Sequence, residues 1–441
     1  MNVAYLDPAY SRYFHELAGT LAARTGGSAV ALLSSPAYRQ YTGDDRAIVW
    51  QPGQTSRLRQ LPPEFEHATW APISDARSVA VFSHAVAWFM ERFVDDAIDV
   101  CLIFSDARPF SVAARLAAAE LGIVCVYFER GAFRLSTSSL STQGLNARFS
   151  LKRAQGQTRI AGMAANAPLK RRAIEPWLRT RFARFVLRNA VACLLEPDRG
   201  RMQHKRYAIG RYARLAVAQW WAEHHHRRAD PGELRGLEGR RLVVVPLQLP
   251  SDSQLVLHSP FADNQAFMRF VVDRVREVAP EAVVFFKRHP MDGAHYRVPE
   301  GARMVAGNLA RFDPADPVVV CINSSAGFES LVRGLRVVCF APSFYADAPP
   351  LVLATPEDFG ARLRETFARR GDPEAGEALR AAVLRWYQAP GDAWAFTSDD
   401  IDATSDIVLQ HYRAASIQLA APQAARLPAL KVVGGAGRAS A

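Results

Sequence analysis

Short runs of apolar residues recur along this sequence, and segments with helical spacing separate them. The first run covers 3–6, a helical segment follows at 13–23, and a second run covers 28–33. A strand, a helix and a second strand in succession form a crossover, which joins parallel rather than antiparallel strands. The pattern returns over 99–128 and again from residue 242 onward. The sequence therefore predicts an α/β fold built on parallel sheets.

The domain organisation follows from length and from one break in the pattern. A chain of 441 residues exceeds what one hydrophobic core usually supports, so we expect two Rossmann-type domains whose parallel sheets face a central cleft. A polar, glycine-rich stretch at 230–240 separates the two strand–helix blocks. The predicted parts are an N-terminal domain at 1–235 with a basic helical extension at about 151–235, a C-terminal domain at 240–350, closing helices at 351–416 and a disordered tail at 417–441.

The balance of charged residues indicates which kind of partner the protein binds. The net charge is +11 and the isoelectric point is near 9.7, which predicts an anionic partner: a nucleic acid, an anionic lipid or a phosphorylated substrate. No helix-turn-helix, zinc or RNA-binding signature accompanies this charge, so we expect no nucleic-acid partner.

The cysteines and the hydropathy of the sequence indicate the cellular compartment of the protein. The five cysteines lie among apolar neighbours and show no metal-binding spacing, so we expect reduced thiols and no metal site. No run of about 18 uncharged apolar residues occurs, which argues against a transmembrane helix. The N-terminus lacks the pattern of a signal peptide. Together these features predict a cytoplasmic protein.

Two polar motifs follow predicted strands in the C-terminal half. Ligands of parallel sheets bind at the carboxyl ends of strands, so both motifs are candidate site residues. Lys287-Arg288-His289-Pro290 offers two cations and a titratable imidazole, which suit a phosphate group. Asn323-Ser324-Ser325-Ala326-Gly327 opens a predicted helix, whose N-terminus attracts anions. The structural alternatives are a solvated basic loop for the first motif and an ordinary helix cap for the second.

Carboxylates also follow predicted strands. Asp252 lies in the polar loop that begins with Gln248, and it is either a nucleophile or base of the site or the cap of a turn or helix. In the N-terminal half, Asp106 and Arg108 follow one strand, and Glu129 is expected in the loop after the next. These three residues either hold a second substrate or form internal salt bridges.

A basic, aromatic segment covers 168–189. Its arginines alternate with Trp177, Phe182 and Phe185. Such a stripe is either one face of the core with solvated arginines or a surface that rests on an anionic membrane.

Taken together, these motifs resemble the capsule polysaccharide synthesis proteins, the bacterial β-Kdo transferases. The resemblance runs from about residue 100 to 350, and its motifs occur in the order of that family. The segments that carry it are SDARP at 105–109, FERGAFR at 128–134, GLN at 144–146, the Gln248 and Asp252 motif at 246–261, FKRHPMD at 286–292 and INSSAG at 322–327.

The resemblance implies a metal-independent, retaining glycosyltransferase of GT-B type with CMP-Kdo as donor, without a cofactor. It implies a lipid, glycolipid or Kdo-linker acceptor, a peripheral position at the cytoplasmic face of the inner membrane, and the capsule export machinery as a further partner. Carried onto this sequence, it assigns catalysis to Asp252 and Glu129, donor binding to Gln248, Lys287, Arg288, His289, Pro290, Asn323, Ser324, Ser325 and Gly327, and the acceptor side to Asp106, Arg108 and Arg134.

The sequence departs from the family pattern at three places. Arg130 stands where the family commonly has a second acidic residue, and Ser325 stands where it commonly has threonine. The stretch 217–240, with three consecutive histidines at 224–226, has no counterpart in the family pattern. Two alternatives therefore remain open: a non-catalytic polysaccharide-binding or export protein, and a transferase that uses another nucleotide sugar.

Overall fold

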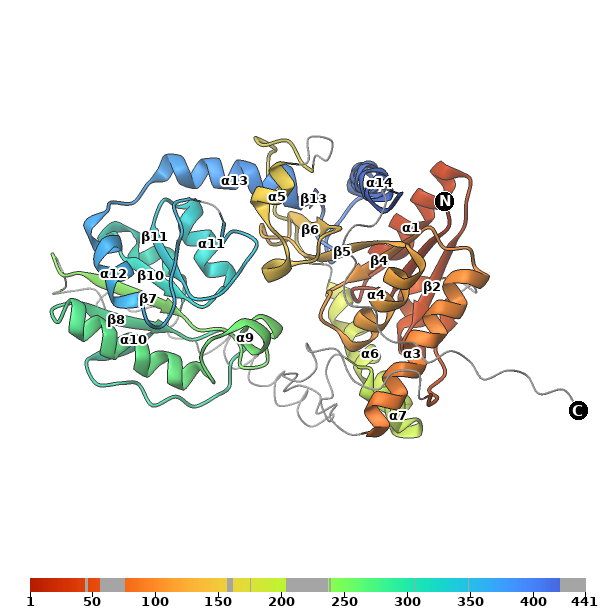
Figure 1. Ribbon diagram of the computed structural model, residues 1–441, viewed down its shortest axis with the longest axis horizontal. Coiled ribbons are helices and arrows are strands. Elements are labelled where there is room, and N and C mark those ends of the chain that lie inside the picture. Colours follow the sequence, from red (N-terminus) through yellow and green to blue (C-terminus); the bar gives the residue numbers. More distant parts are fainter. Residues whose placement is uncertain are drawn as a thin grey trace, which may run out of the picture. The chain divides into compact units, whose positions relative to one another are not determined.

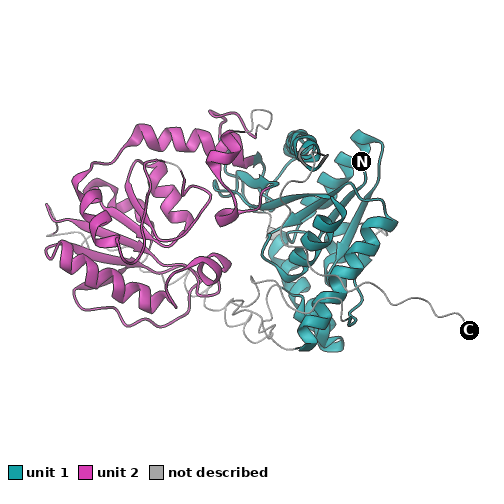
Figure 2. Ribbon diagram, in the orientation of Figure 1, with its two compact units in different colours: residues 1–142, 169–206, 389–441 teal, residues 143–168, 207–388 magenta. Residues whose placement is uncertain are grey.

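The fold is an α/β fold of two compact units, seen here in a computed structural model (Figures 1 and 2). It describes residues 1–43, 47–55, 76–156, 162–174, 176–203, 237, 239–305, 307–347 and 349–420. The N-terminal unit comprises 1–142, 169–206 and 389–441, and the C-terminal unit comprises 143–168 and 207–388. The predicted pair of α/β domains with parallel sheets is confirmed. That the two sheets face a cleft stays a prediction.

The N-terminal unit holds a seven-stranded sheet in the order β13-β6-β5-β4-β1-β2-β3. Strands β1 to β5 are parallel, and β6 pairs antiparallel with β5. Because β2 and β3 lie on one side of β1 while β4 and β5 lie on the other, the topological switch point falls between β1 and β4. The strands are β1 (Val3–Leu6), β2 (Ala29–Leu33), β3 (Ala47–Val49), β4 (Val100–Phe104), β5 (Val124–Arg130), β6 (Thr137–Ser141) and β13 (Gln388–Pro390).

Helices cover this sheet in two pairs. Helix α1 packs on α14, and α3 packs on α4, so the central strands β1 and β4 are buried along their whole length. The described helices are α1 (Tyr13–Thr25), η1 (Pro36–Tyr38), α2 (Arg39–Thr42), α3 (Ala76–Asp95), α4 (Pro109–Leu121), α6 (Pro176–Leu195), α7 (Pro197–Arg201) and α14 (Ser398–Ala420). This burial explains why the strands read as continuous apolar runs in the sequence.

The basic aromatic segment forms α6. Its Leu178 and Phe185 are buried, as expected of a core face. On its outward side Leu187 is 58% exposed and Leu194 is 80% exposed. The core interpretation is therefore confirmed for one face of α6, and membrane contact through the other stays a prediction.

The C-terminal unit holds a six-stranded, fully parallel sheet in the order β12-β11-β10-β7-β8-β9. Strands β8 and β9 extend to one side of β7, and β10 to β12 extend to the other, so its switch point falls between β7 and β10. The strands are β7 (Leu242–Pro246), β8 (Val283–Lys287), β9 (Ala302–Val305), β10 (Val318–Cys321), β11 (Arg336–Cys339) and β12 (Val352–Leu353). The helices are η3 (Asn146–Arg148), α5 (Leu151–Gln155), α9 (Ser253–His258), α10 (Asn264–Val278), η5 (Leu309–Ala315), α11 (Ser325–Val332), α12 (Phe359–Ala368) and α13 (Pro373–Tyr387).

Among the described residues, the predicted boundaries differ from these units in three respects. Segment 143–168 belongs to the C-terminal unit rather than to the N-terminal domain. The closing helices at 351–416 are divided, since α12 and α13 complete the C-terminal unit whereas α14 packs on α1. The predicted tail begins inside α14, which continues to Ala420. The remainder of that tail and the three histidines lie outside the described residues.

A pair of glycines in the C-terminal unit tests helix packing. A Cβ on Gly376 of α13 would lie 2.5 Å from the carbonyl oxygen of Leu331 in α11. We expect Gly376→Ala to lower the free energy of unfolding by about 1–3 kcal/mol, because the helices must separate. Gly360→Ala in α12 is the control, because its Cβ meets only Val278 Cγ2 at an ordinary 3.6 Å. Urea denaturation of both variants measures the difference, and equal stabilities would contradict this packing.

Candidate functional site

The candidate site lies at the carboxyl ends of β7, β8 and β10 in the C-terminal unit. Gln248 follows β7, His289 follows β8 and Asn323 follows β10. Strands β7 and β10 are neighbours whose connections leave in opposite directions, and such a switch point opens a crevice above a parallel sheet. The predicted donor residues therefore come together at the position where this fold binds ligands.

A buried pair of carboxamides spans the switch point. Gln248 Nε2 donates to Asn323 Oδ1 at 3.0 Å, and Asn323 Nδ2 donates to the carbonyl oxygen of Pro342 at 3.1 Å. Both side chains are 6% exposed. The sequence assigned both residues to donor binding, whereas these contacts show that their side chains fix one loop against the other.

The network continues through residues that the sequence did not single out. Asn264, at the start of α10, donates from Nδ2 to the carbonyl oxygen of Gln248 at 2.8 Å and to the Tyr296 hydroxyl at 3.0 Å. That hydroxyl donates to Asp292 Oδ2 at 2.6 Å. Burial raises the pKa of Tyr296 to about 12, and its bond to Asp292 adds to this rise. The hydroxyl therefore keeps its proton and its place in the network at neutral pH.

The basic motif stands at the end of β8. Burial lowers the pKa of the Lys287 ammonium, and the charge of Glu329 partly opposes this effect. His289 Nδ1 accepts a hydrogen bond from the backbone N–H of Met291 at 3.1 Å, so the neutral ring carries its proton on Nε2. The Arg288 guanidinium lies 5.5 Å from the centre of the Tyr296 ring, and Pro290 is exposed. This loop thus offers a lysine, an arginine and an N–H donor.

The serine motif forms the N-terminus of α11. Ser324 is its N-cap residue, but the hydroxyl does not cap the helix. Within the described part of the chain this buried oxygen has the Cys321 thiol as a polar neighbour and makes no hydrogen bond of good geometry. The carbonyl oxygen of Ser324 accepts a bond from the Tyr345 hydroxyl at 2.6 Å. Ser325 is exposed. A polar group without a hydrogen bond of good geometry beside the positive end of a helix favours an anionic ligand.

Packing explains why a glycine stands at position 327, whereas the sequence indicated donor binding. A Cβ at this position would lie 2.6 Å from both Cys321 Sγ and the Tyr345 hydroxyl. The glycine therefore lets α11 pack on its own sheet, and its place in the motif needs no ligand to explain it.

Asp252 is the N-cap residue of α9. Its Oδ1 accepts the backbone N–H of Gln254 at 2.9 Å, which confirms the helix-cap alternative. The side chain is half-buried, and Oδ2 has no hydrogen-bond partner among the described residues. One oxygen thus caps the helix, and the catalytic role of Asp252 stays a prediction.

Glu129 corrects the sequence analysis. It lies within β5 and pairs with Ser139 of β6, not in a loop after the strand. The strand continues beyond its apolar run because the β5–β6 hairpin supplies hydrogen bonds. Its neighbour Arg130 forms an ion pair with the buried Asp392 at 3.2 Å and lies 4.1 Å from the centre of the Trp394 ring.

The three predicted acceptor-side residues all belong to the N-terminal unit. Asp106 and Arg108 are buried in the turn after β4. Arg134 is exposed and donates from Nη1 to the carbonyl oxygen of Arg130 at 3.2 Å. Arg134 lies in the turn between β5 and β6, so the three residues follow two neighbouring parallel strands.

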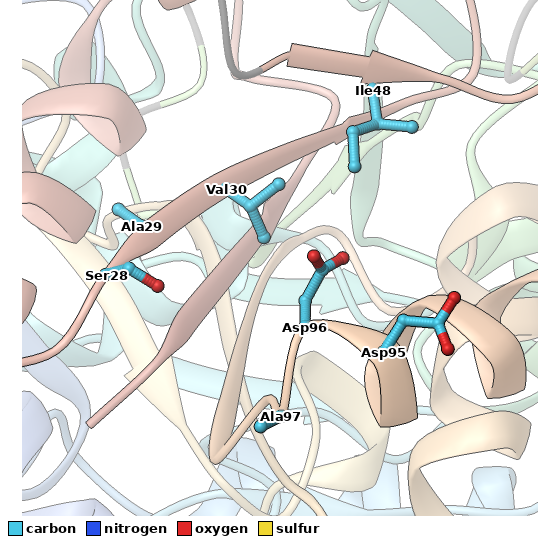
Figure 3. Close-up of a pocket in the computed structure, with 7 residues that line it drawn as sticks. All are labelled: Ser28, Ala29, Val30, Ile48, Asp95, Asp96 and Ala97. Carbon is cyan, nitrogen blue, oxygen red and sulfur yellow. The ribbon is translucent and has the colours of Figure 1, made fainter.

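A cavity of about 470 Å³ lies elsewhere, as Figure 3 shows. Its lining includes Ser28 and Ala29 at the start of β2, and Asp95 to Ala97 after α3. These residues stand at the amino ends of the strands, away from the edge where parallel sheets bind ligands. None of the candidate residues lines it.

Across the described ranges, no three His, Cys, Asp or Glu side chains gather closely enough to hold a metal ion. None of the helices in those ranges combines the length and the apolar character that crossing a membrane requires.

Comparison with known proteins identifies the family. Residues 99–349 match the model of the family described as capsule polysaccharide biosynthesis protein, which is more than half of the chain. The chain belongs to this family. The matched range contains the whole Gln248–Asn323 network and all the predicted site residues.

Individual relatives share one third or less of the aligned residues with this chain. Protein FixF of Sinorhizobium fredii is 33% identical over 158 residues, which cover 34% of this chain and 38% of FixF. The capsule polysaccharide export protein KpsS of Escherichia coli is 26% identical over 281 residues, covering 58% of this chain and 71% of KpsS. Among solved structures, the β-Kdo 2,7-transferase KpsC of Thermosulfurimonas dismutans aligns with a TM-score of 0.37 and 16% identity, covering 73% of this chain and 89% of that one.

The buried network of the family site can be tested at Asn264. We expect Asn264→Ala to lower the free energy of unfolding by about 1–3 kcal/mol, because it leaves the buried carbonyl of Gln248 without its donor. Gln265→Ala is the matched control, since its hydrogen bonds to Arg297 are exposed and water can replace them. Chemical denaturation measures both variants, and an equally small loss in each would contradict the network's role.

Proposed function

We propose that this protein is a glycosyltransferase of capsular or surface-polysaccharide assembly. In this proposal it transfers Kdo from CMP-Kdo to a (lyso)phospholipid or Kdo-linker acceptor, with retention of configuration and without a metal ion. It works at the cytoplasmic face of the inner membrane, beside the export machinery. Family membership and the motif resemblance support the proposal, and the arginines and exposed leucines of α6 agree with a membrane-surface position.

The observation that carries the proposal is the buried Ser324 hydroxyl at the β7–β10 switch point. Among the described residues it makes no hydrogen bond of good geometry, and it stands at the N-terminus of α11. The loop from β8, which bears Lys287 and His289, is tied to the same edge through Asp292, Tyr296 and Asn264. Cations, an N–H donor and a helix N-terminus at one sheet edge are groups that hold a phosphate.

The chemistry requires a good leaving group and a stabilised sugar cation. CMP leaves more easily once its phosphate charge is neutralised. Lys287, His289 and the first turn of α11 supply the cation, the N–H donor and the helix N-terminus for this. Asp252 provides a carboxylate for the oxocarbenium-like centre, as nucleophile or as base. The catalytic role that the resemblance gives to Glu129 stays a prediction, with this residue paired to Ser139 at the end of β5.

Nucleotide selectivity tests the donor assignment. We expect CMP to raise the melting temperature of the purified protein more than CDP, UDP or GDP does at equal concentration, because a ligand stabilises the state that binds it. Differential scanning fluorimetry measures the four shifts. Stabilisation by UDP or GDP instead would move the donor to another nucleotide sugar, and no shift with any nucleotide would favour a non-catalytic export protein.

Asp252→Asn tests the catalytic carboxylate. Asparagine also caps helices, so the variant should keep its melting temperature and its affinity for CMP. We expect turnover with CMP-Kdo and a lipid acceptor to fall about 10²–10⁴-fold, because the charge that serves the sugar cation is lost. Activity is measured as CMP release.

The matched control is Asp263→Asn at the N-cap of α10, whose Oδ1 accepts the backbone N–H of Ala266 at 2.7 Å. This variant changes the same residue type in the same structural role, and it should retain full turnover. Full activity of Asp252→Asn would remove that residue from the mechanism.

A further inference from the structure

A second polar cluster occupies the carboxyl edge of the N-terminal sheet. Asp7 follows β1, Ser34 follows β2, and Arg108 stands between β4 and α4. The switch point of this sheet falls between β1 and β4, so Asp7 and Arg108 stand on either side of it. This is the position where an open parallel sheet binds its ligand.

Asp7 is held firmly in this cluster. Its Oδ1 accepts the backbone N–H of Ser34 at 2.8 Å, and its Oδ2 accepts the Ser34 hydroxyl at 2.6 Å. Gln203 donates to that hydroxyl oxygen at 3.0 Å. Burial raises the pKa of Asp7 to about 6, although its bonds to Ser34 and the charges of Arg108 and Arg199 oppose the rise. Each carboxylate oxygen keeps a lone pair for a further donor.

The charges of two buried arginines act on Asp7, and the two side chains differ in their hydrogen bonds. Arg199 is 2% exposed, and its Nη1 donates to the carbonyl oxygens of Ser34 at 2.6 Å and Trp50 at 2.8 Å. Its Nε donates to Glu196 at 2.7 Å. Arg199 is therefore a structural cation, whose hydrogen bonds tie α7 to the ends of β2 and β3.

Arg108 lacks such partners. It is 7% exposed, and its Nε and Nη1 are buried without a hydrogen-bond partner among the described residues. Its guanidinium carbon lies 5.0 Å from the centre of the Phe104 ring and 5.9 Å from that of Tyr10. A buried cation without hydrogen bonds costs stability, and such groups are concentrated at sites that bind ligands.

The first turn of α4 also attracts an anion to this edge of the sheet. Arg108 is its N-cap residue, and its side chain does not cap the helix. Pro109 opens the helix, which runs for 13 residues, so the N-terminal backbone N–H groups and the positive end of the helix dipole meet at this edge. An anion here would satisfy the helix and the guanidinium together.

We propose that Arg108 and the first turn of α4 bind the carboxylate or phosphate of a small polyhydroxylated ligand, while Asp7 accepts a hydrogen bond from a hydroxyl of that ligand. The ligand class is a sugar acid or a phosphorylated glycerol. This inference rests on the proposed function for one point, that the ligand is the acceptor end of the transfer. Asp7 and Ser34 then select the hydroxyl, and Arg108 selects the charge.

Paired arginine variants test the site without any turnover. Differential scanning fluorimetry of the full chain is run with glycerol 3-phosphate, gluconate, inorganic phosphate and glycerol. We expect wild type to be stabilised by the first two, less by inorganic phosphate and not by glycerol. The larger of the first two shifts tells a phosphorylated headgroup from a sugar acid.

Arg108→Leu should keep or raise the melting temperature of the ligand-free protein and abolish the anion-induced shifts. Arg199→Leu should lower the melting temperature, because its buried acceptors lose their donor. Arg108→Lys keeps the charge without the planar fork, so glycerol 3-phosphate or gluconate should bind about 10-fold more weakly. A melting temperature that falls as far in Arg108→Leu as in Arg199→Leu, together with anion shifts that persist in Arg108→Lys at wild-type strength, would make Arg108 structural and overturn the proposal.

Asp7→Asn separates the hydroxyl contact from the charge contact. The advantage of glycerol 3-phosphate over inorganic phosphate should shrink in this variant, whereas an undiminished advantage would remove Asp7 from the site. The CMP shift reports the proposed function independently. A CMP shift without any Arg108-dependent anion shift would retain the transferase and reject this site, and the reverse result would retain the site and reject the donor assignment.

Discussion

The hydrogen bond between Gln248 and Asn323 is the contact on which the candidate donor site depends. Loops that follow parallel strands are fixed only at the strand ends, so their far residues need another anchor. At the β7–β10 switch point the two carboxamides supply that anchor, and Asn264, Tyr296 and Asp292 extend it to the loop after β8. Apart from the Asp292 carboxylate the network uses neutral groups, and Tyr296 keeps its proton and donates it to that carboxylate.

The two units place polar residues at the same point of their sheet topology, but the residue types differ. In each sheet the strand order reverses beside the first strand of the unit, and polar residues gather at that edge. The C-terminal edge is made of carboxamides, hydroxyls and partly buried cations. The N-terminal edge instead holds a carboxylate beside two buried arginines, of which only Arg199 is fully hydrogen-bonded to its surroundings. In the proposed function, this difference corresponds to two ligands, of which one carries a leaving phosphate and the other offers a hydroxyl.

Local pattern predicted the elements well because both sheets are covered on two faces. The opening strand–helix–strand unit and the strands β7, β8 and β10 occur where apolar periodicity placed them. Contacts between segments distant in sequence were not predictable in this way. Asn264 was not singled out, Glu129 was placed in a loop and Gly327 was assigned to donor binding. Only the folded sheet brings Gln248, Ser139 and Tyr345 beside these three residues. The importance of Asp7 and Ser34 was hidden for the same reason.

The return of α14 to the N-terminal unit has a consequence for the order of events during synthesis. Its Ile407 and Val408 lie in the same apolar core as Phe14 and Leu17 of α1, and Arg24 forms ion pairs with Asp402 and Asp406. The face of α1 that meets them stays bare on the ribosome while nearly four hundred residues are translated. The C-terminal unit, whose strands all lie within one stretch of chain, can close first. The N-terminal unit is thus the last to finish its core, and its exposed α1 face is the surface that a nascent-chain chaperone would need to shield.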